Sequence, residues 1–170
     1  MNTFKEINPQ DISESPFTLI GKDWMLVTAG TEKKFNTMTA SWGGVGIMWN
    51  KPVVFTFIRP QRYTYEFIEN EEFFTLSFFT EDYRSALKLC GAKSGRDVDK
   101  VAQTGLTPYF DENAPYFKEA KLVLVCRKMY NQALKEDCIF DPTIKASYND
   151  DGSDYHKMYV SEIVKALVRE

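Results

Sequence analysis

One short stretch of the chain, NTMTASW, has residue types that suit a ligand better than a core. It places an amide, three hydroxyls and a tryptophan on a single predicted strand; its members are Asn36, Thr37, Met38, Thr39, Ala40, Ser41 and Trp42. A strand that serves only the core is richer in Val, Ile and Leu. The small polar side chains therefore indicate that backbone and hydroxyl groups approach something other than the core.

Two further clusters carry groups that bind phosphate. The segment RPQRYT follows a strongly apolar strand and supplies Arg59, Arg62, Tyr63 and Thr64. The segment KSGR supplies Lys93, Ser94, Gly95 and Arg96. It precedes a predicted helix, whose first N–H groups and dipole favour an anion. Each cluster also has a simpler explanation: the first as a solvated basic turn, and the second as a helix start whose dipole Asp97 and Asp99 offset.

Several classes of function are disfavoured by what the sequence lacks. His156 is the single histidine and there is no G-x-S-x-G, which argues against a Ser-His-Asp hydrolase. There is no phosphate-binding G-x-x-x-x-G-K-[ST] segment, and GGVG at residues 43–46 lacks the third glycine of a dinucleotide fingerprint. These glycines suit either a bend in a strand or close backbone approach to a ligand. With net charge −3 and scattered basic residues, we expect no nucleic acid partner.

The cysteines and the lengths of the apolar runs indicate in which cellular compartment the protein is expected. Cys90, Cys126 and Cys138 are odd in number and far apart, so we expect no disulfide and no metal site. Free thiols fit a reducing cytoplasm, with Cys138 the candidate reactive thiol. The first seventeen residues lack the apolar core of a signal peptide, and no run reaches the length of a membrane span. We therefore expect a cytoplasmic protein with no membrane partner.

Extended segments dominate the predicted secondary structure. The predicted strands are FTLI, WMLVTAG, NTMTASW, PVVFTFI, FFTLSFF, AKLVLVCRKMY and HKMYVSEIVKALV, with a turn at residues 21–23. Predicted helices cover QRYTYEFIENEE, TEDYRSALKLCGAK and SGRDVDKVAQTG. Their expected caps are Thr80 and Ser94 at the N-termini and Gly91 and Gly105 near the ends, and residues 108–115 are expected to form a loop.

Strands separated by a few short helices, without regular β-α alternation, predict a closed or sandwiched sheet. No linker or repeat divides the chain. We therefore expect a mainly β (α+β) protein with a single domain over residues 1–170.

Taken in order, NTMTASW, RPQRYTYEFI, FFTLSFF, KSGRDVDKV and YHKMYVSEIV resemble the flavin reductase-like family, the FMN-binding split barrels that include flavoredoxin. The resemblance runs from about residue 15 to the end. Ser161 stands where the family's last long strand has a glycine. The resemblance implies a Greek-key-like split β-barrel and a homodimer, with FMN in a groove near the subunit interface.

The resemblance also implies roles for the three clusters. Residues 36–42 would line the flavin ring, Arg59 with residues 62–64 would form the phosphate-side loop, and residues 93–96 would make a second anion contact. On this basis Arg59→Ala or Lys93→Ala should each weaken FMN binding by about 1.5–3 kcal/mol. His156 would orient nicotinamide or flavin, although a lone histidine on a strand also suits a structural hydrogen bond.

The implied activity is that of a flavin oxidoreductase, in which NAD(P)H gives a hydride to flavin N5 and the electrons pass to an acceptor that the sequence does not identify. Two alternatives stay open. One is an electron-transfer module that holds FMN and is reduced by a partner protein. The other is a barrel that binds no flavin. The choice between NADH and NADPH, and the role of residues 137–155, are also open.

Overall fold

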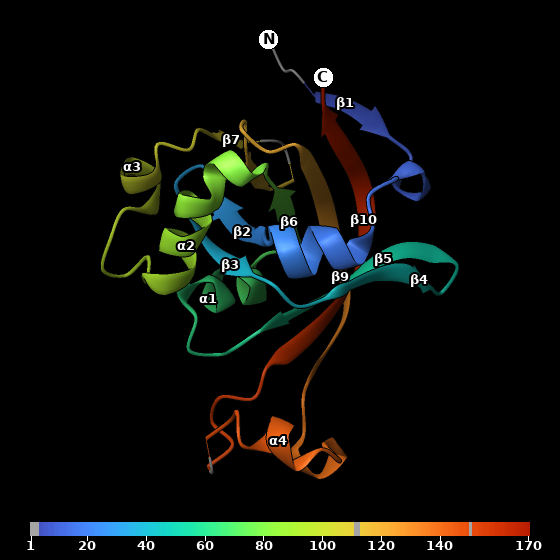
Figure 1. Cartoon of the computed structure of the whole chain (residues 1–170), viewed down its shortest axis with the longest axis vertical. Coiled ribbons are helices and arrows are strands. Elements are labelled where there is room, and N and C mark those ends of the chain that lie inside the picture. The colour runs from blue at the N-terminus through green and yellow to red at the C-terminus, as the bar shows by residue number, and fades with distance from the viewer. Residues whose placement is uncertain (1–3, 111–112, 150) are drawn as a thin grey trace.

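An eight-stranded antiparallel sheet forms the centre of the protein (Figure 1). The computed structural model describes residues 4–110, 113–149 and 151–170. Strands follow the order β3-β2-β6-β9-β10-β5-β4, and β1 pairs with β10. Their bounds are β1 Phe4–Ile7, β2 Met25–Thr31, β3 Lys34–Ala40, β4 Gly44–Met48, β5 Lys51–Ile58, β6 Phe73–Phe78, β9 Leu122–Ala133 and β10 Lys157–Arg169. The mainly β prediction is confirmed.

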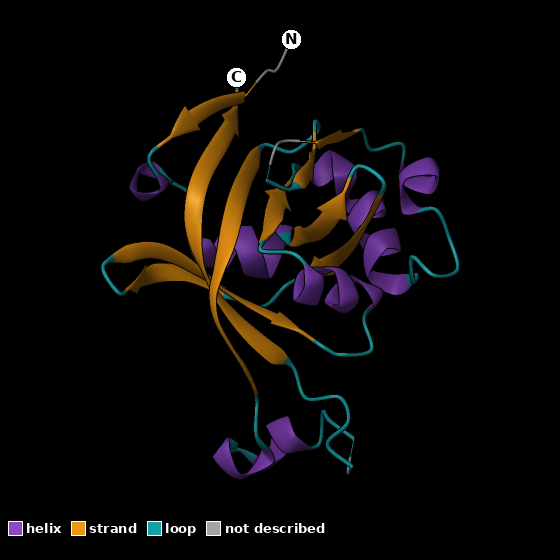
Figure 2. Ribbon diagram, turned by 180° about the vertical axis from the view of Figure 1, so that it is seen from behind, coloured by secondary structure: helices purple, strands orange, loops and turns teal. Residues whose placement is uncertain are grey.

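Three helices lie together at the left of Figure 1. They are α1 Tyr63–Asn70, α2 Arg84–Ala92 and α3 Lys100–Thr104. Of the segment that joins β9 to β10, residues 134–149 and 151–156 project from the body and carry the short helix α4, Pro142–Lys145 (Figure 2). We call residues 134–149 and 151–156 the projecting segment.

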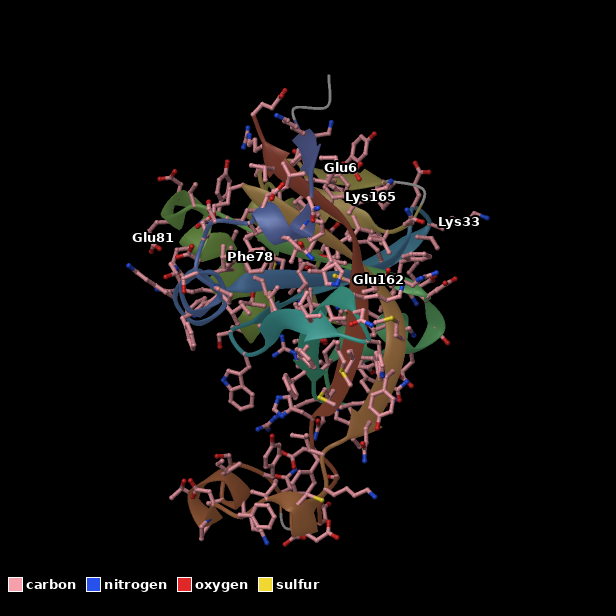
Figure 3. All side chains as sticks on the ribbon, turned by 90° about the vertical axis from the view of Figure 1, so that its right-hand side faces the viewer. Glu6, Lys33, Phe78, Glu81, Glu162 and Lys165 are labelled. Carbon is pink, nitrogen blue, oxygen red and sulfur yellow. The ribbon has the colours of Figure 1, made fainter. Side chains whose placement is uncertain are left out.

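The sheet buries side chains on both of its faces. One apolar cluster includes Val54, Phe74 and Phe78, and a second lies between the sheet and α2, where Leu87 packs with Val123. Figure 3 shows Phe78 in the interior, with Lys33 and Glu81 at opposite edges of the molecule. Apolar burial on both faces explains why the central strands lack a simple apolar-polar alternation.

The last strand bends where its pairing with β9 changes register. The shifts fall between Val160 and Ser161 and between Ile163 and Lys165. Such bulges increase the local twist and bend the strand. Ser161 is fully buried, and its hydroxyl has no hydrogen-bond partner among the described residues.

The prediction of a strand at FTLI is wrong, because Phe17–Asp23 forms a π-helix. Adjacent Leu19 and Ile20 are both buried while Phe17 is 90% exposed, which is not the alternation of a strand. A short apolar run does not by itself distinguish strand from helix.

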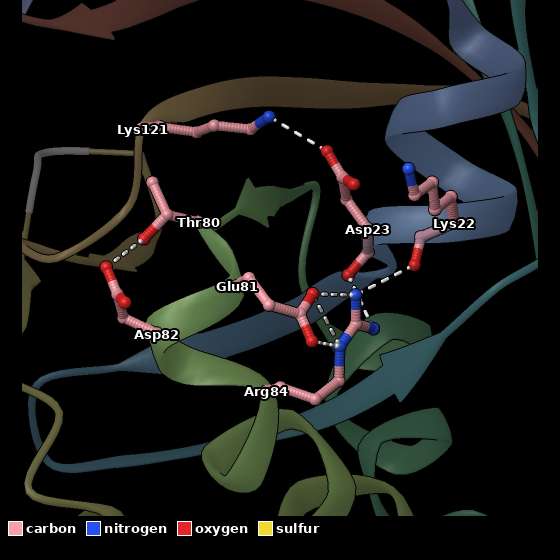
Figure 4. Close-up of polar contacts among 7 residues, drawn as sticks. All are labelled: Lys22, Asp23, Thr80, Glu81, Asp82, Arg84 and Lys121. Carbon is pink, nitrogen blue, oxygen red and sulfur yellow. Dashed lines mark hydrogen bonds and ion pairs between the residues drawn. The ribbon is translucent and has the colours of Figure 1, made fainter.

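Long-range contacts hold the end of this π-helix, as Figure 4 shows. The Arg84 guanidinium donates to the backbone carbonyls of Lys22 at 2.9 Å and Asp23 at 3.1 Å, and it pairs with Glu81 at 2.8 Å. Lys121 Nζ lies 2.9 Å from the Asp23 carboxylate. Residues sixty or more positions away thus fix the local structure.

The helix predicted to start at Ser94 begins later. Ser94 Oγ accepts a hydrogen bond from the Arg96 N–H at 3.2 Å within a turn. The N-cap of α3 is Asp99, whose carboxylate accepts from the Ala102 N–H at 3.0 Å. Segment 93–96 is therefore a loop and not a helix N-terminus. Gly105 ends α3 with φ of 71°, as predicted.

The other cap and loop predictions are corrected in detail. Thr80 precedes a 3-10 turn, Glu81–Tyr83, and makes no capping hydrogen bond, so α2 starts at Arg84. Gly91 lies inside α2. The expected loop at 108–115 includes strand residues at both ends, in β7 Pro108–Phe110 and β8 Pro115–Phe117, which pair with each other. Residues 111–112 of that loop lie outside the described residues.

The GGVG segment fits the first of its two explanations, a bend in the chain at a strand. Gly43 has φ of 145°, and a Cβ there would lie 2.6 Å from the Phe55 backbone oxygen. Gly43 therefore allows the chain to pass close to β5 just before β4 begins.

Candidate functional site

A cavity of about 190 Å³ lies beside the end of β3. Its lining residues are Met38, Thr39, Ala40, Ser41, Trp42, Phe57, Arg59, Arg62 and His156. Strand β3 ends at Ala40, so Ser41 and Trp42 follow the strand and do not belong to it. The Trp42 side chain is 54% exposed and its ring lies 4.9 Å from that of His156. We call this cavity the ring cavity.

A second cavity of about 150 Å³ adjoins the first, and both are lined by Met38 and Arg62. Its lining residues are Asn36, Met38, Gln61, Arg62, Tyr63, Thr64, Gly91, Ala92, Lys93, Ser94, Gly95 and Lys100. We call it the anion cavity. Segments that are far apart in the sequence, at 36–42, 59–64 and 93–95, thus line one continuous region.

Two predicted site residues point elsewhere. The Thr37 hydroxyl bonds to the Thr28 hydroxyl at 2.8 Å inside the sheet. The Arg96 guanidinium pairs with the Glu66 carboxylate and lies 4.5 Å from the centre of the Tyr63 ring, and Arg96 does not line either cavity.

Close packing of a glycine against an amide shapes the anion cavity. Asn36 Nδ2 donates to the Thr64 hydroxyl at 2.8 Å, which fixes the buried amide. A Cβ at Gly95 would lie 2.0 Å from Asn36 Oδ1, so the loop 93–96 can approach β3 only with glycine at this position. This contact joins two of the three predicted clusters.

Three cations line the anion cavity without a carboxylate partner among the described residues, Arg62, Lys93 and Lys100. Lys93 is exposed, whereas Arg62 is half-buried and Lys100 is buried. Lys100 is 6% exposed, and its Nζ donates to the carbonyls of Thr37 at 2.6 Å and Cys90 at 2.8 Å. Burial lowers the pKa of Lys100 to about 8, with Arg62 contributing, and burial also lowers the pKa of Arg62. An anion bound between Arg62 and Lys100 would offset the free-energy cost of burying these two positive charges.

Lys100 is the site residue that the sequence analysis missed. Helical lysines are usually solvated, and only the packing of α3 against α2 and β3 buries this one. No local pattern in DVDKVAQTG distinguishes a buried lysine from an exposed one.

Arg59 lines the ring cavity but is held by the projecting segment. Its guanidinium donates to the Asp154 carboxylate at 3.0 Å and to the Ser147 carbonyl at 3.0 Å, and lies 5.1 Å from the centre of the Tyr148 ring. Because its charge is already paired, Arg59 fits an anion contact less well than Arg62 does.

His156 lies immediately before β10, between Trp42 and the projecting segment. The Tyr148 hydroxyl is 2.8 Å from His156 Nδ1. Burial, together with the nearby Arg59 charge, lowers the pKa of His156 to about 4. The ring is therefore neutral at physiological pH and offers one donor and one acceptor.

The three cysteines are free, and only Cys138 is exposed. Burial raises the pKa of the Cys90 and Cys126 thiols. Among the described residues there is no cluster of His, Cys, Asp or Glu that would hold a metal ion. Over the same residues, no helix is long and apolar enough to cross a membrane.

The two cavities together suit a flat molecule with an anionic tail. Small side chains and aromatic rings surround the ring cavity, and unpaired cations with hydroxyl and amide groups surround the anion cavity. An antiparallel sheet with two such adjoining cavities is compatible with the split barrels that the sequence resembles.

The flavin reductase-like domain matches residues 18–170, and the chain belongs to that family. An FMN-binding domain of a flavin reductases-like enzyme from Shewanella baltica superposes with a TM-score of 0.71 at 17% identity, covering 99% of this chain and 78% of that one. Flavoredoxin from Methanosarcina acetivorans gives 0.66 at 25% identity, covering 87% and 69%. A putative flavin reductase from Shewanella frigidimarina gives 0.68 at 19% identity, covering 93% and 76%. A comparison with curated proteins finds no match.

Proposed function

We propose that the chain binds FMN, with the isoalloxazine in the ring cavity and the phosphate in the anion cavity, and that it is an NAD(P)H-dependent flavin oxidoreductase. The observation that carries the proposal is that two cations of the anion cavity, half-buried Arg62 and buried Lys100, have no carboxylate partner among the described residues. Family membership and the flavoredoxin likeness support the same cofactor.

The residues that would hold FMN divide by the part of the molecule they meet. Arg62, Thr64 and Lys93 with the loop 93–95 would bind the phosphate, and Lys100 would supply a buried charge beneath it. Residues 38–42 would present backbone and hydroxyl groups to the ring. Bound FMN would supply the redox chemistry, accepting a hydride from NAD(P)H.

The protein's own contribution is position and water exclusion. The Thr39 hydroxyl donates to the Leu87 carbonyl at 2.5 Å, which fixes β3 against α2 beside the cavity. Trp42 and neutral His156 cover one side of the ring cavity. No acidic or basic side chain is needed to move a proton for hydride transfer, which agrees with a single neutral histidine.

We also propose a homodimer, as the family resemblance implies. Ile47 and Trp49 on the β4 hairpin and Tyr130 on β9 are large apolar residues that are 62%, 55% and 41% exposed. Exposed apolar groups of this size favour burial against a second copy.

The proposal is tested by reconstituting the protein with FMN and adding NADH or NADPH without oxygen. Loss of the visible flavin absorbance is expected. A colourless protein that does not retain FMN would contradict flavin binding. A yellow protein that both nucleotides leave oxidised, but that a reductase protein bleaches, would favour the electron-transfer alternative.

A further inference from the structure

Tyr148 of the projecting segment contacts the wall of the ring cavity without lining the cavity itself. Its side chain is 8% exposed, and its hydroxyl oxygen lies 2.8 Å from His156 Nδ1. His156 lines the ring cavity, and its ring lies 4.9 Å from that of Trp42. The proposed function assigns no role to the Tyr148 hydroxyl.

Several contacts hold the Tyr148 ring in place. The ring stacks on that of Tyr155, with the ring centres 4.5 Å apart. The Arg59 guanidinium lies 5.1 Å from the centre of the Tyr148 ring, and Arg59 is itself held by Asp154 and by the Ser147 carbonyl, both at 3.0 Å. Because packing and hydrogen bonds fix this ring, its hydroxyl stays in one position beside His156.

The hydrogen bond between Tyr148 and His156 has a preferred direction. Nδ1 is the only hydrogen-bond partner of the Tyr148 hydroxyl among the described residues. If Nδ1 carried the imidazole proton, the hydroxyl would have to accept it, and the proton of the hydroxyl would lack an acceptor in this part of the chain. Buried polar groups nearly always have a partner, so the hydroxyl donates and Nδ1 accepts.

This direction determines what the other nitrogen of His156 offers. A neutral imidazole that accepts at Nδ1 carries its proton on Nε2. Burial and the Arg59 charge lower the pKa of His156 to about 4, so the ring is neutral at physiological pH. Nε2 has no hydrogen-bond partner among the described residues, and it is not among their fully enclosed unpaired atoms. One N–H donor of His156 is therefore available at the ring cavity.

We propose that Tyr148 is a positioning residue that fixes the tautomer and the orientation of His156, so that the Nε2 N–H donates to a carbonyl oxygen of the molecule bound at the ring cavity. The inference rests on the proposed function, which supplies two sources of such an oxygen, the flavin ring and the carboxamide of the nicotinamide. A hydrogen bond at one nitrogen of an imidazole sets the role of the other, which is how a residue outside the cavity can act on its contents.

The first experiment reads the tautomer directly in the whole chain without any cofactor. His156 is the only histidine, so labelling histidine with ¹⁵N gives the signals of a single imidazole. Correlation of the two nitrogens with the ring C–H protons distinguishes a protonated nitrogen from an unprotonated one. We expect the proton on Nε2 in the wild-type protein, and a mixture of the two tautomers in Tyr148→Phe. A wild-type protein with the proton on Nδ1 overturns the inference, whether or not flavin binds.

The second experiment identifies the source of the carbonyl oxygen. FMN is added first, and the oxidised form of NADH or NADPH is then added to the FMN-loaded protein. A changed Nε2 signal with FMN alone identifies a carbonyl of the flavin, and a change that requires the nucleotide identifies the carboxamide. An unchanged Nε2 signal after both additions, in a protein that binds FMN, overturns the inference. A protein that binds no FMN contradicts the proposed function instead, and the tautomer measurement still stands.

Substitutions separate positioning from packing. Tyr148→Phe keeps the ring and should weaken binding of the ligand so identified by about three- to tenfold, the loss of one hydrogen bond. Tyr155→Phe is the matched control, because the Tyr155 hydroxyl makes no hydrogen bond among the described residues, and it should leave the affinity unchanged. In His156→Gln, which keeps an N–H donor, adding Tyr148→Phe should have no further effect. Losses that add in the double variant would show that Tyr148 acts through packing, and would overturn the inference.

Discussion

The two arginines that line the ring cavity, Arg59 and Arg62, differ in whether their charge is already paired. Arg59 is tied to Asp154 and Ser147, whereas Arg62 is half-buried, lines both the ring and the anion cavity, and has no carboxylate partner among the described residues. A charge-assisted hydrogen bond to a phosphate is therefore expected from Arg62 in preference to Arg59.

Arg62→Ala should weaken FMN binding by about 1.5–3 kcal/mol, because it removes a charge-assisted contact in a partly dry cavity. Riboflavin, which lacks the phosphate, should bind equally well to both proteins. Isothermal titration with both ligands measures the difference. Arg59→Ala is the comparison and should affect both ligands alike. A larger loss for FMN in Arg59→Ala than in Arg62→Ala would contradict this assignment.

Lys100 should make FMN binding depend on pH. Its pKa in the free protein is about 8. A bound phosphate favours the charged form and raises that pKa, so above about pH 8 binding requires uptake of a proton. Affinity should therefore be highest near pH 7 and fall as the pH rises through 8.

The measurement is the FMN dissociation constant between pH 7 and 10, with riboflavin as the uncharged control. Lys100→Met keeps the length of the side chain and should give weaker binding that no longer changes with pH over this range. An unchanged slope in Lys100→Met would show that another group titrates.

For individual residues, the sequence predicted which side chains suit ligand binding but not which side chains contact one another. NTMTASW indicated a ligand from residue types, whereas RPQRYT and KSGR were assigned anion contacts through the family resemblance. The structure brings parts of all three to adjoining cavities. That Arg59 is paired and Lys100 buried depends on Asp154 and on the packing of α3, which are distant in sequence. Tertiary contacts thus give residues of the same type different surroundings, which the sequence alone does not show.

Among the secondary-structure elements, the long strands could be predicted from the sequence, whereas short helices and turns could not. The apolar runs at 53–58, 73–78 and 122–126 form strands that are mostly buried between neighbouring strands. The π-helix Phe17–Asp23 depends on Arg84, which no local pattern reveals. The turn at Trp49 and Asn50, with φ of 53° and 57°, joins β4 to β5 without the usual glycine.

One buried carboxylate of the projecting segment, Asp154, forms an ion pair with the body of the protein. Asp154 is 3% exposed, and it accepts from Arg59 at 3.0 Å and from the Asn149 N–H at 2.7 Å. Removing its charge leaves Arg59 without a carboxylate partner beside the ring cavity. The segment and the cavity wall are therefore coupled through this ion pair.

Asp154→Asn should loosen residues 147–156 by roughly 1–3 kcal/mol without unfolding the sheet. Amide hydrogen exchange should become faster in this segment and stay unchanged in β6 and β9. Asp137→Asn, at an exposed position of the same segment, is the matched control. Equal exchange in both variants would show that the ion pair does not hold the segment.

For the whole molecule, the surface proposed as the dimer interface and the ring cavity are connected by strand β5. The β4 hairpin carries Ile47 and Trp49, and β5 continues from it to Phe57 and Arg59 at the ring cavity. In Figure 2 this hairpin extends away from the group of helices on the other side of the molecule. Its exposed apolar residues are available to a second copy. The Trp49 ring lies 6.3 Å from that of Tyr130 on β9, which makes the exposed apolar surface continuous across two strands.

Trp49→Asn should convert the dimer to a monomer of 19.7 kDa. Trp49 has φ of 53° in a two-residue hairpin turn, and asparagine is favoured at that position, so the substitution removes apolar surface without straining the backbone. Sedimentation equilibrium gives the mass, and an unchanged melting temperature of the monomeric fraction shows that the fold is intact. Phe140→Ser removes an exposed aromatic residue from the projecting segment and should leave the mass unchanged. A wild-type protein that sediments as a monomer, or a Trp49→Asn variant that stays dimeric, would rule out this surface as the dimer interface.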